Sequence, residues 1–172
     1  GDFNGWKESE KYRLCPVGDS GNWELKLPLK AMKHLDLYKM KVYWNGGCGE
    51  RIPAWCQRVV QDESTKIFSA QVWDPEKPYV FSKRSFRPHR DPLLIYECHI
   101  GMGQDAEKVG SYNEFRENVL PRVVKEGYNC LQIMALQEHP YYGSFGYHVS
   151  SFFAASSRFG TPDELKQLID EA

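Results

Sequence analysis

The sequence has no long apolar run, no excess of charge of either sign and no paired spacing among its few cysteines. No stretch approaches the ~18 consecutive apolar residues that a membrane-spanning helix needs. The 172 residues carry a formal net charge of -1, which offers no strongly basic surface to nucleic acid or to an anionic membrane. The mean hydropathy of -0.59 is typical of a soluble globular chain. We therefore expect neither a membrane nor a nucleic-acid partner.

The cysteines number only five and are scattered: they are Cys15, Cys48, Cys56, Cys98 and Cys130. An odd number without regular spacing favours reduced thiols in a cytoplasmic protein over a disulfide framework. The histidines show neither HxH nor HExxH spacing, so the sequence predicts no metal site. The chain begins at Gly1, directly on a motif and without Met, and we expect that a preceding segment is missing.

Residues 1–82 have the pattern of short β-strands joined by turns. Residues 23–27 alternate apolar and charged side chains and residues 37–44 alternate again, which predicts two half-buried strands. The tripeptide Asn45-Gly46-Gly47 predicts a turn, because asparagine and glycine tolerate positive φ. Short strands separated by turn residues indicate an immunoglobulin-like β-sandwich.

From Leu93 onward the pattern changes to alternating strands and helices. Residues 93–100 open with a continuous apolar run, which predicts a strand buried on both faces, and residues 129–136 repeat it. The order strand, helix, strand, helix favours a parallel sheet with right-handed crossovers. This order is that of the first two βα units of a (β/α)8 TIM barrel.

The two predicted helices carry their own start signals. Ser111 with Glu114, and Thr161 with Glu164, have capping-box spacing. Apolar residues then recur at helical intervals: Tyr112, Phe115, Val119 and Val123 in the first helix, and Leu165, Leu168, Ile169 and Ala172 in the second. Pro121 predicts either a kink in the first helix or a turn beside it.

We divide the chain into a β-module at residues 1–82, a linker at 83–92 and the start of an α/β barrel at 93–172. Prolines and a basic run mark the linker. A complete barrel takes ~250 residues, so we expect a truncated barrel whose two strands lack neighbours on both sides. Unpaired strand edges favour association, and we expect less order from Leu93 onward than over residues 1–82.

The hexapeptide GDFNGW at residues 1–6 resembles the opening of carbohydrate-binding module family 48. The resemblance continues at residues 21–25, 38–39 and 45–46. In that family a Trp and a Lys on one sheet face hold α-glucan, and by position they match Trp6 and either Lys39 or Lys41. An indole stacks on the apolar face of glucose, and a long cation donates to its hydroxyls. The alternative reading leaves Trp6 as a cap on the sandwich core and the lysines as a solvated face.

Residues 95–102, IYECHIGM, resemble the first barrel strand of glycoside hydrolase family 13. Residues 132–149 and 152–162 resemble the branching enzymes within that family, and the resemblance covers essentially the whole chain. Amylases and debranching enzymes share the barrel and its Tyr, but not the sequence that surrounds this Tyr. The resemblance implies a truncated module followed by a truncated catalytic barrel.

The resemblance also implies that Tyr147 contacts substrate. It matches the family Tyr that stacks against the sugar at the cleavage subsite, where a π-face supports an oxocarbenium-like transition state. The alternative is a core Tyr beneath the loop. His148, where many relatives have Gln, either donates to sugar hydroxyls or packs. The long segment from Gln137 to Pro162 is predicted to be a functional loop, since structureless connections of that length are uncommon.

By residue type alone, Glu97 and Glu138 are candidates for a retaining carboxylate pair. The resemblance argues against that role, because the nucleophile Asp, the acid/base Glu and the second Asp of the family lie on later strands and match no residue here. It therefore implies no catalytic residue in this chain and a loop-orienting role for both glutamates. We expect Arg158 to hold the loop in place.

The implied activity is cleavage of an α-1,4 link through a covalent glucosyl-enzyme, followed by transfer of the chain to a 6-hydroxyl. That retaining chemistry needs two carboxylates and neither a metal nor an organic cofactor. The implied partner is an α-1,4-glucan such as glycogen, amylose or amylopectin, in the cytoplasm or, in a plant, a plastid. Two alternatives stay open: an amylase-type or debranching hydrolase, and a non-catalytic glucan-binding module.

Overall fold

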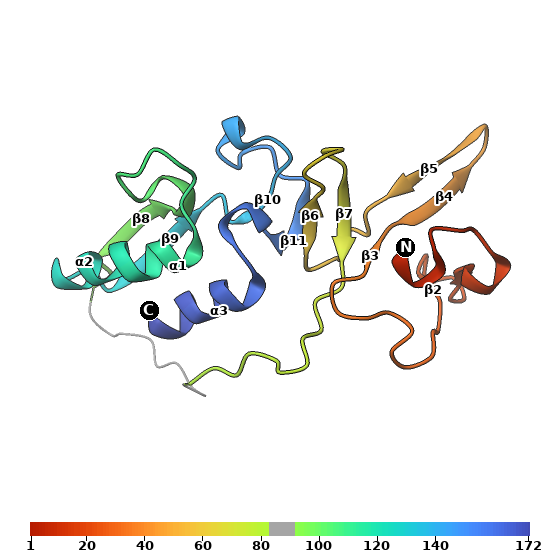
Figure 1. The fold of residues 1–172 in the computed structure, drawn as a ribbon, viewed down its shortest axis with the longest axis horizontal. Helices are drawn as coiled ribbons and strands as arrows, with labels where there is room; N and C mark the ends of the chain where they lie inside the picture. The colour runs from red at the N-terminus through yellow and green to blue at the C-terminus, as the bar shows by residue number, and fades with distance from the viewer. Residues whose placement is uncertain (83–91) are drawn as a thin grey trace.

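The computed structural model describes residues 1–82 and 92–172, so the predicted linker lies, apart from Pro92, outside the described residues. The strands are β1 Cys15–Pro16, β2 Trp23–Glu24, β3 Leu37–Tyr38, β4 Met40–Trp44, β5 Gly47–Arg51, β6 Val59–Gln61, β7 Phe68–Gln71, β8 Ile95–His99, β9 Cys130–Met134, β10 Gln137–Glu138 and β11 Ser151–Ala155. The helices are α1 Tyr112–Glu114, α2 Leu120–Lys125 and α3 Pro162–Glu171, with a π-helical segment, Phe115–Val119, between α1 and α2. Figure 1 shows the β4–β5 hairpin at one end, β8 and β9 with α1 and α2 at the other, and β10 and β11 between them.

The β-rich character predicted for residues 1–82 is confirmed, but the described strands form small separate sheets. They are the pair β1–β2, the pair β4–β5 and the three-stranded sheet β3-β7-β6, all antiparallel. The strand predicted at residues 37–44 is divided at Lys39, since β3 pairs with β7 whereas β4 pairs with β5. Side-chain alternation continues through such a change of partner and does not reveal it. The turn after Trp44 is confirmed and consists of Asn45 and Gly46 alone, with Gly46 at φ 87°, while Gly47 already belongs to β5.

The predicted parallel pairing is confirmed: β8 pairs with β9 in parallel, from Ile95 opposite Cys130 to His99 opposite Met134. The intervening helical segment begins at Ser111, whose side chain and that of Glu114 form the predicted capping box. Pro121 is accommodated in the first turn of α2, immediately after the π-helical segment, in which the Leu120 N–H bonds to the Phe115 carbonyl. The wider turn therefore accommodates a proline that an uninterrupted α-helix would not tolerate.

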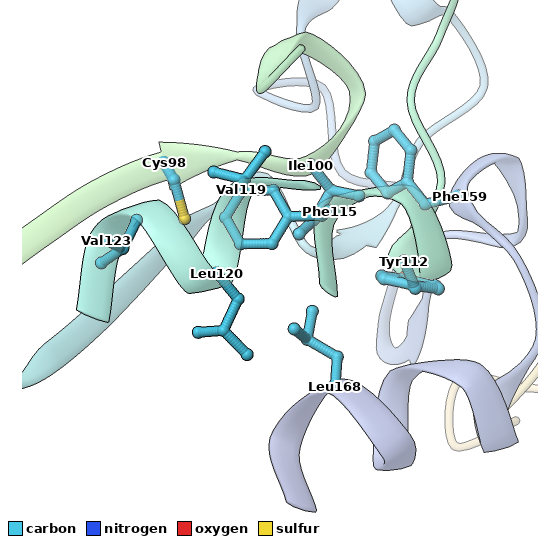
Figure 2. Packing of buried hydrophobic residues seen from close by; sticks show 9 residues of the cluster. All are labelled: Cys98, Ile100, Tyr112, Phe115, Val119, Leu120, Val123, Phe159 and Leu168. Carbon is cyan, nitrogen blue, oxygen red and sulfur yellow. The ribbon is translucent and has the colours of Figure 1, made fainter. Parts of the chain in front are cut away.

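The largest buried cluster packs one face of β8 against the helices (Figure 2). Its members are Cys98, Ile100, Tyr112, Phe115, Val119, Leu120, Val123, Phe159 and Leu168. The apolar stripe predicted for the first helix is thus fully buried. In α3 the prediction holds only in part, because Leu168 is buried while Ile169 and Ala172 are exposed. Burial in the cluster raises the pKa of the Cys98 thiol to about 11. None of the five cysteines, all of which lie in the described residues, forms a disulfide.

Residues 93–172 were expected to be less ordered than residues 1–82, yet they contain the larger share of the buried residues. The cluster in residues 1–82 is small, with Cys56, Val59 and Ala70 joined by Ala154 from β11. The strand predicted to be buried on both faces is covered along one of them, while the other is buried only at its end, by His99, and Ile95 remains 47% exposed. The physical reason is that the helical segment covers a single face of the β8–β9 pair.

Among the described helices none is long and apolar enough to cross a membrane.

We therefore expect hydrogen exchange to be slowest around the large cluster, in β8 and the segment Tyr112–Val123. Amides in the exposed β4–β5 hairpin are expected to exchange about 100-fold faster, because local opening there exposes little buried surface. Exchange followed by mass spectrometry on the monomeric chain measures both. Equal or slower exchange in β4–β5 would show that residues 1–82 are the more stable part.

Residues 58–82 connect the two parts of the chain through α3. The Trp73 indole N–H donates to Asp163 Oδ1 at 3.2 Å, and the Tyr79 hydroxyl donates to Asp170 Oδ2 at 2.8 Å. The Arg58 guanidinium donates to the Gly160 carbonyl at 3.2 Å and lies over the Trp73 ring. These contacts hold α3, and Gly160 just before it, against the β-rich part.

Candidate functional site

The segment from Gln137 to Pro162 is folded and is not a plain loop. β10 and β11 pair antiparallel, with a register irregularity between Gln137 and Glu138. The sequence predicted a functional loop here without strands of its own, because a strand of two residues and one of five leave no readable alternation. The pairing brings the two ends of the segment together and projects residues 139–150 as a compact excursion.

A strained turn lies within this excursion. Phe145 and Gly146 both adopt the left-handed conformation, with φ of 50° and 85°. The Phe145 N–H donates to the Tyr142 carbonyl at 2.8 Å, and the Tyr147 N–H donates to the Ser144 carbonyl at 3.0 Å. A Cβ on Gly146 would lie 2.2 Å from the Ala135 Cβ, so glycine is required by both conformation and space. Non-glycine residues in this conformation cost on the order of 1–3 kcal/mol and cluster at functional sites.

The turn presents Tyr147 to solvent. Its side chain is 78% exposed, so the alternative of a core Tyr beneath the loop is wrong. His148 is exposed as well. The turn lies at the carboxyl ends of β8 and β9, because His99 at the end of β8 contacts Phe145 and Ala135 follows directly after β9. In folds built on parallel strands, binding and active sites form at this end of the strands.

Two buried histidines support the excursion. His99 Nε2 lies 3.3 Å from the Phe145 carbonyl oxygen, and His139 Nδ1 lies 3.0 Å from the Gln137 carbonyl oxygen. A carbonyl only accepts, so each of these nitrogens carries the proton and the tautomers are fixed. Both rings pack edge-on or tilted against Phe159. Burial is the main cause that lowers the pKa of His99, with the neighbouring His139 acting in the same direction and the hydrogen bond to Phe145 opposing them.

Glu138 has a structural position. Its side chain is 0% exposed, and its carboxylate accepts the backbone N–H groups of His139 at 3.1 Å and Ser157 at 2.7 Å. Glu97 is exposed and accepts from the Gln132 amide at 3.5 Å. A fully buried carboxylate with two backbone donors orients the segment and has no access to substrate. Arg158 likewise holds the excursion, by donating to the Pro140 carbonyl at 2.8 Å.

The candidates from the β-rich part have partners within the chain. Trp6 is 45% exposed, adopts φ of 59° and donates its indole N–H to Asp2 Oδ1 at 2.8 Å. Lys39 is paired with Glu50 at 3.2 Å, and its side chain is only 14% exposed. Lys41 is paired with Glu8 at 3.5 Å and is more accessible. Lys41 therefore has more freedom than Lys39 to reach a ligand.

The sequence did not predict an exposed aromatic pair elsewhere in the molecule. Trp55 and Phe153 stack with centroids 4.3 Å apart, and their side chains are 76% and 53% exposed. A hollow of about 360 Å³ is lined by Trp55, together with Tyr38 and Trp73. The two rings come from the turn before β6 and from β11, so no sequence pattern could have joined them. Among the described residues no group of three or more His, Cys, Asp or Glu side chains could hold a metal ion.

No family model matches this chain. It is 42% identical over 179 aligned residues to the 1,4-alpha-glucan-branching enzyme of Dictyostelium discoideum, with 100% of this chain and 26% of that protein covered. It is 45% identical to the 1,4-alpha-glucan-branching enzyme of Equus caballus, again over 100% of this chain and 25% of the relative. It is 44% identical to the chloroplastic/amyloplastic 1,4-alpha-glucan-branching enzyme 2-2 of Arabidopsis thaliana, 22% of which is covered. The chain spans about a quarter of the length of these curated relatives, and over its whole length it is similar to 1,4-alpha-glucan-branching enzymes.

Proposed function

We propose that this chain contributes glucan-contacting and scaffolding elements to a 1,4-alpha-glucan-branching enzyme. Such an enzyme cleaves an α-1,4 link while a carboxylate attacks the anomeric carbon and an acid protonates the leaving oxygen. The glucosyl-enzyme then reacts with a 6-hydroxyl of an acceptor chain, and the same acid, now a base, takes that proton. Two inversions retain the α configuration. In this proposal the reacting carboxylates lie on segments outside this chain.

The observation that carries the proposal is the placement of Tyr147. An exposed aromatic ring stands on a strained, glycine-dependent turn at the carboxyl ends of two parallel strands. Its electron-rich face suits a sugar ring that acquires positive charge in the transition state. The turn fixes the backbone from which the ring projects, and the exposed ring is accessible to a stacking partner. His148, also exposed, would donate to sugar hydroxyls beside it.

The finer architecture belongs to the same proposal. Residues 1–82 would form an immunoglobulin-like carbohydrate-binding module, with 83–92 as the linker and 93–172 as the first two βα units of a (β/α)8 barrel. In the module Trp6 and Lys39 would contact glucan. Because Lys39 is mostly buried against Glu50, this contact would require the pair to open or Lys41 to take its place. The partner would be glycogen, amylose or amylopectin, in the cytoplasm or a plastid.

We expect the 172-residue chain by itself to have no branching activity, because none of its carboxylates matches the catalytic residues of the family. Incubation with amylose, followed by iodine colour and by counting of α-1,6 ends after debranching, measures this. A full-length enzyme that contains the sequence serves as the positive control and is expected to form new α-1,6 links. Release of reducing sugars without α-1,6 links in that control would favour a hydrolase. Turnover by the short chain would place catalytic residues within it.

A further inference from the structure

We propose that His99 is a positioning residue, whose imidazole fixes the turn of residues 144–146 and so sets the orientation of the Tyr147 ring. The inference rests on the proposed function in so far as Tyr147 contacts glucan. It concerns a side chain at the end of β8 that is buried, 7% exposed, and has no access to substrate of its own. It acts through the backbone of Phe145, which lies 46 positions further along the chain.

A hydrogen bond joins the end of β8 to the turn. His99 Nε2–H donates to the Phe145 carbonyl at 3.3 Å. Phe145 has a left-handed conformation that few non-glycine residues adopt. Its carbonyl belongs to the peptide unit that joins Phe145 to Gly146. A donor fixed on a β-strand therefore acts on the peptide unit that determines the direction in which the chain leaves the turn.

The direction in which Tyr147 projects depends on this backbone. Its ring is 78% exposed, so packing contributes little to its orientation. The turn is closed by two short-range bonds, from the Phe145 and Tyr147 N–H groups to carbonyls three residues earlier. Those bonds define the shape of the turn, whereas the bond from His99 links it to the parallel sheet. The close approach of Gly146 to Ala135 links the turn in the same way to the end of β9.

Stability alone does not explain an imidazole at position 99. With Nε2 protonated in the neutral ring, His99 Nδ1 is a buried acceptor without a hydrogen-bond partner among the described residues. Leaving a buried polar atom unpaired is unfavourable, and a phenyl ring of similar size in the same aromatic surroundings would avoid it. The imidazole is therefore explained by the bond that its other nitrogen makes to the turn.

The experiment uses a full-length enzyme that contains this sequence. We expect His99→Phe to lower kcat about 10-fold with KM changed less than about 2-fold, since a misdirected ring loses mainly transition-state contact. His99→Gln, whose amide can reach the same carbonyl, is expected to recover activity to within about 3-fold, while the shorter His99→Asn is not. In a Tyr147→Ala background, His99→Phe is expected to cost less than about 2-fold, because residues that act through one another are not additive. Tyr142→Phe is the matched control, since it removes the 3.3 Å bond from the same excursion to the Gly101 carbonyl.

Amide exchange at Tyr147 provides a readout that does not depend on catalysis. We expect about 10-fold faster exchange there in His99→Phe and no change in Tyr142→Phe. If exchange rises but Tyr147→Ala leaves kcat/KM unchanged, the positioning holds and the proposed role of Tyr147 fails. Unchanged exchange, or an equal loss of kcat in the Tyr147→Ala background, would overturn the positioning role. If His99→Phe does not fold, the Gln and Asn variants decide, and equal activity and exchange in both would likewise overturn it.

Discussion

Replacement of Tyr147 by alanine, in a full-length enzyme that contains this sequence, is expected to lower kcat/KM by about 100-fold, equivalent to ~3 kcal/mol of transition-state stabilisation. The ring projects from a turn whose left-handed residues and glycine contact fix its backbone, and its exposed side chain supports no core. Its removal therefore deletes a sugar contact without opening a cavity, and the folded state should persist.

Steady-state branching rates with amylose, together with a thermal unfolding midpoint, test this expectation. Tyr147→Phe keeps the ring and is expected to stay within about 3-fold of the parent, which separates stacking from the hydroxyl. Phe152→Ala, at another exposed aromatic in the same segment, is the matched control and should have little effect. A loss below 2-fold in a folded Tyr147→Ala variant would remove Tyr147 from the site.

Replacement of Glu138 by alanine is expected to lower the free energy of unfolding by about 3–5 kcal/mol, a large effect for one residue. The backbone N–H groups of His139 and Ser157 would lose their acceptor in a site that excludes water. The charge of Glu138 also acts on Arg58, whose pKa burial lowers and Glu138 raises. Removal of that negative charge would weaken the compensation of a partly buried guanidinium, for which Glu164 would remain.

Urea denaturation followed by tryptophan fluorescence measures this loss. Glu138→Gln retains one oxygen acceptor and is expected to lose less, while Glu97→Ala, at the exposed glutamate of β8, should stay within about 0.5 kcal/mol of the parent. A stable Glu138→Ala variant that has lost all activity would instead return Glu138 to the catalytic candidates. A change below about 1 kcal/mol with full activity would show that the segment is held without it.

Patterns within short stretches of sequence were enough to predict the local elements of residues 93–172. The capping boxes at Ser111 and Thr161 form as predicted, because each depends on side chains three residues apart. The buried stripe of the first helical segment and the parallel β8–β9 pair also follow from patterns within a single element and from their order along the chain. The turn at Asn45 and Gly46 belongs to the same class of local signal.

The contacts between residues far apart in the chain could not be predicted in this way. The division of the strand at Lys39 depends on whether β5 or β7 is the partner, and backbone pairing leaves no mark on side-chain alternation. The burial of Glu138, the bond from His99 to the turn and the exposure of Tyr147 all arise from contacts between segments far apart in the chain. A sequence records the chemistry of each side chain, but long-range packing determines whether that chemistry faces the interior or the solvent.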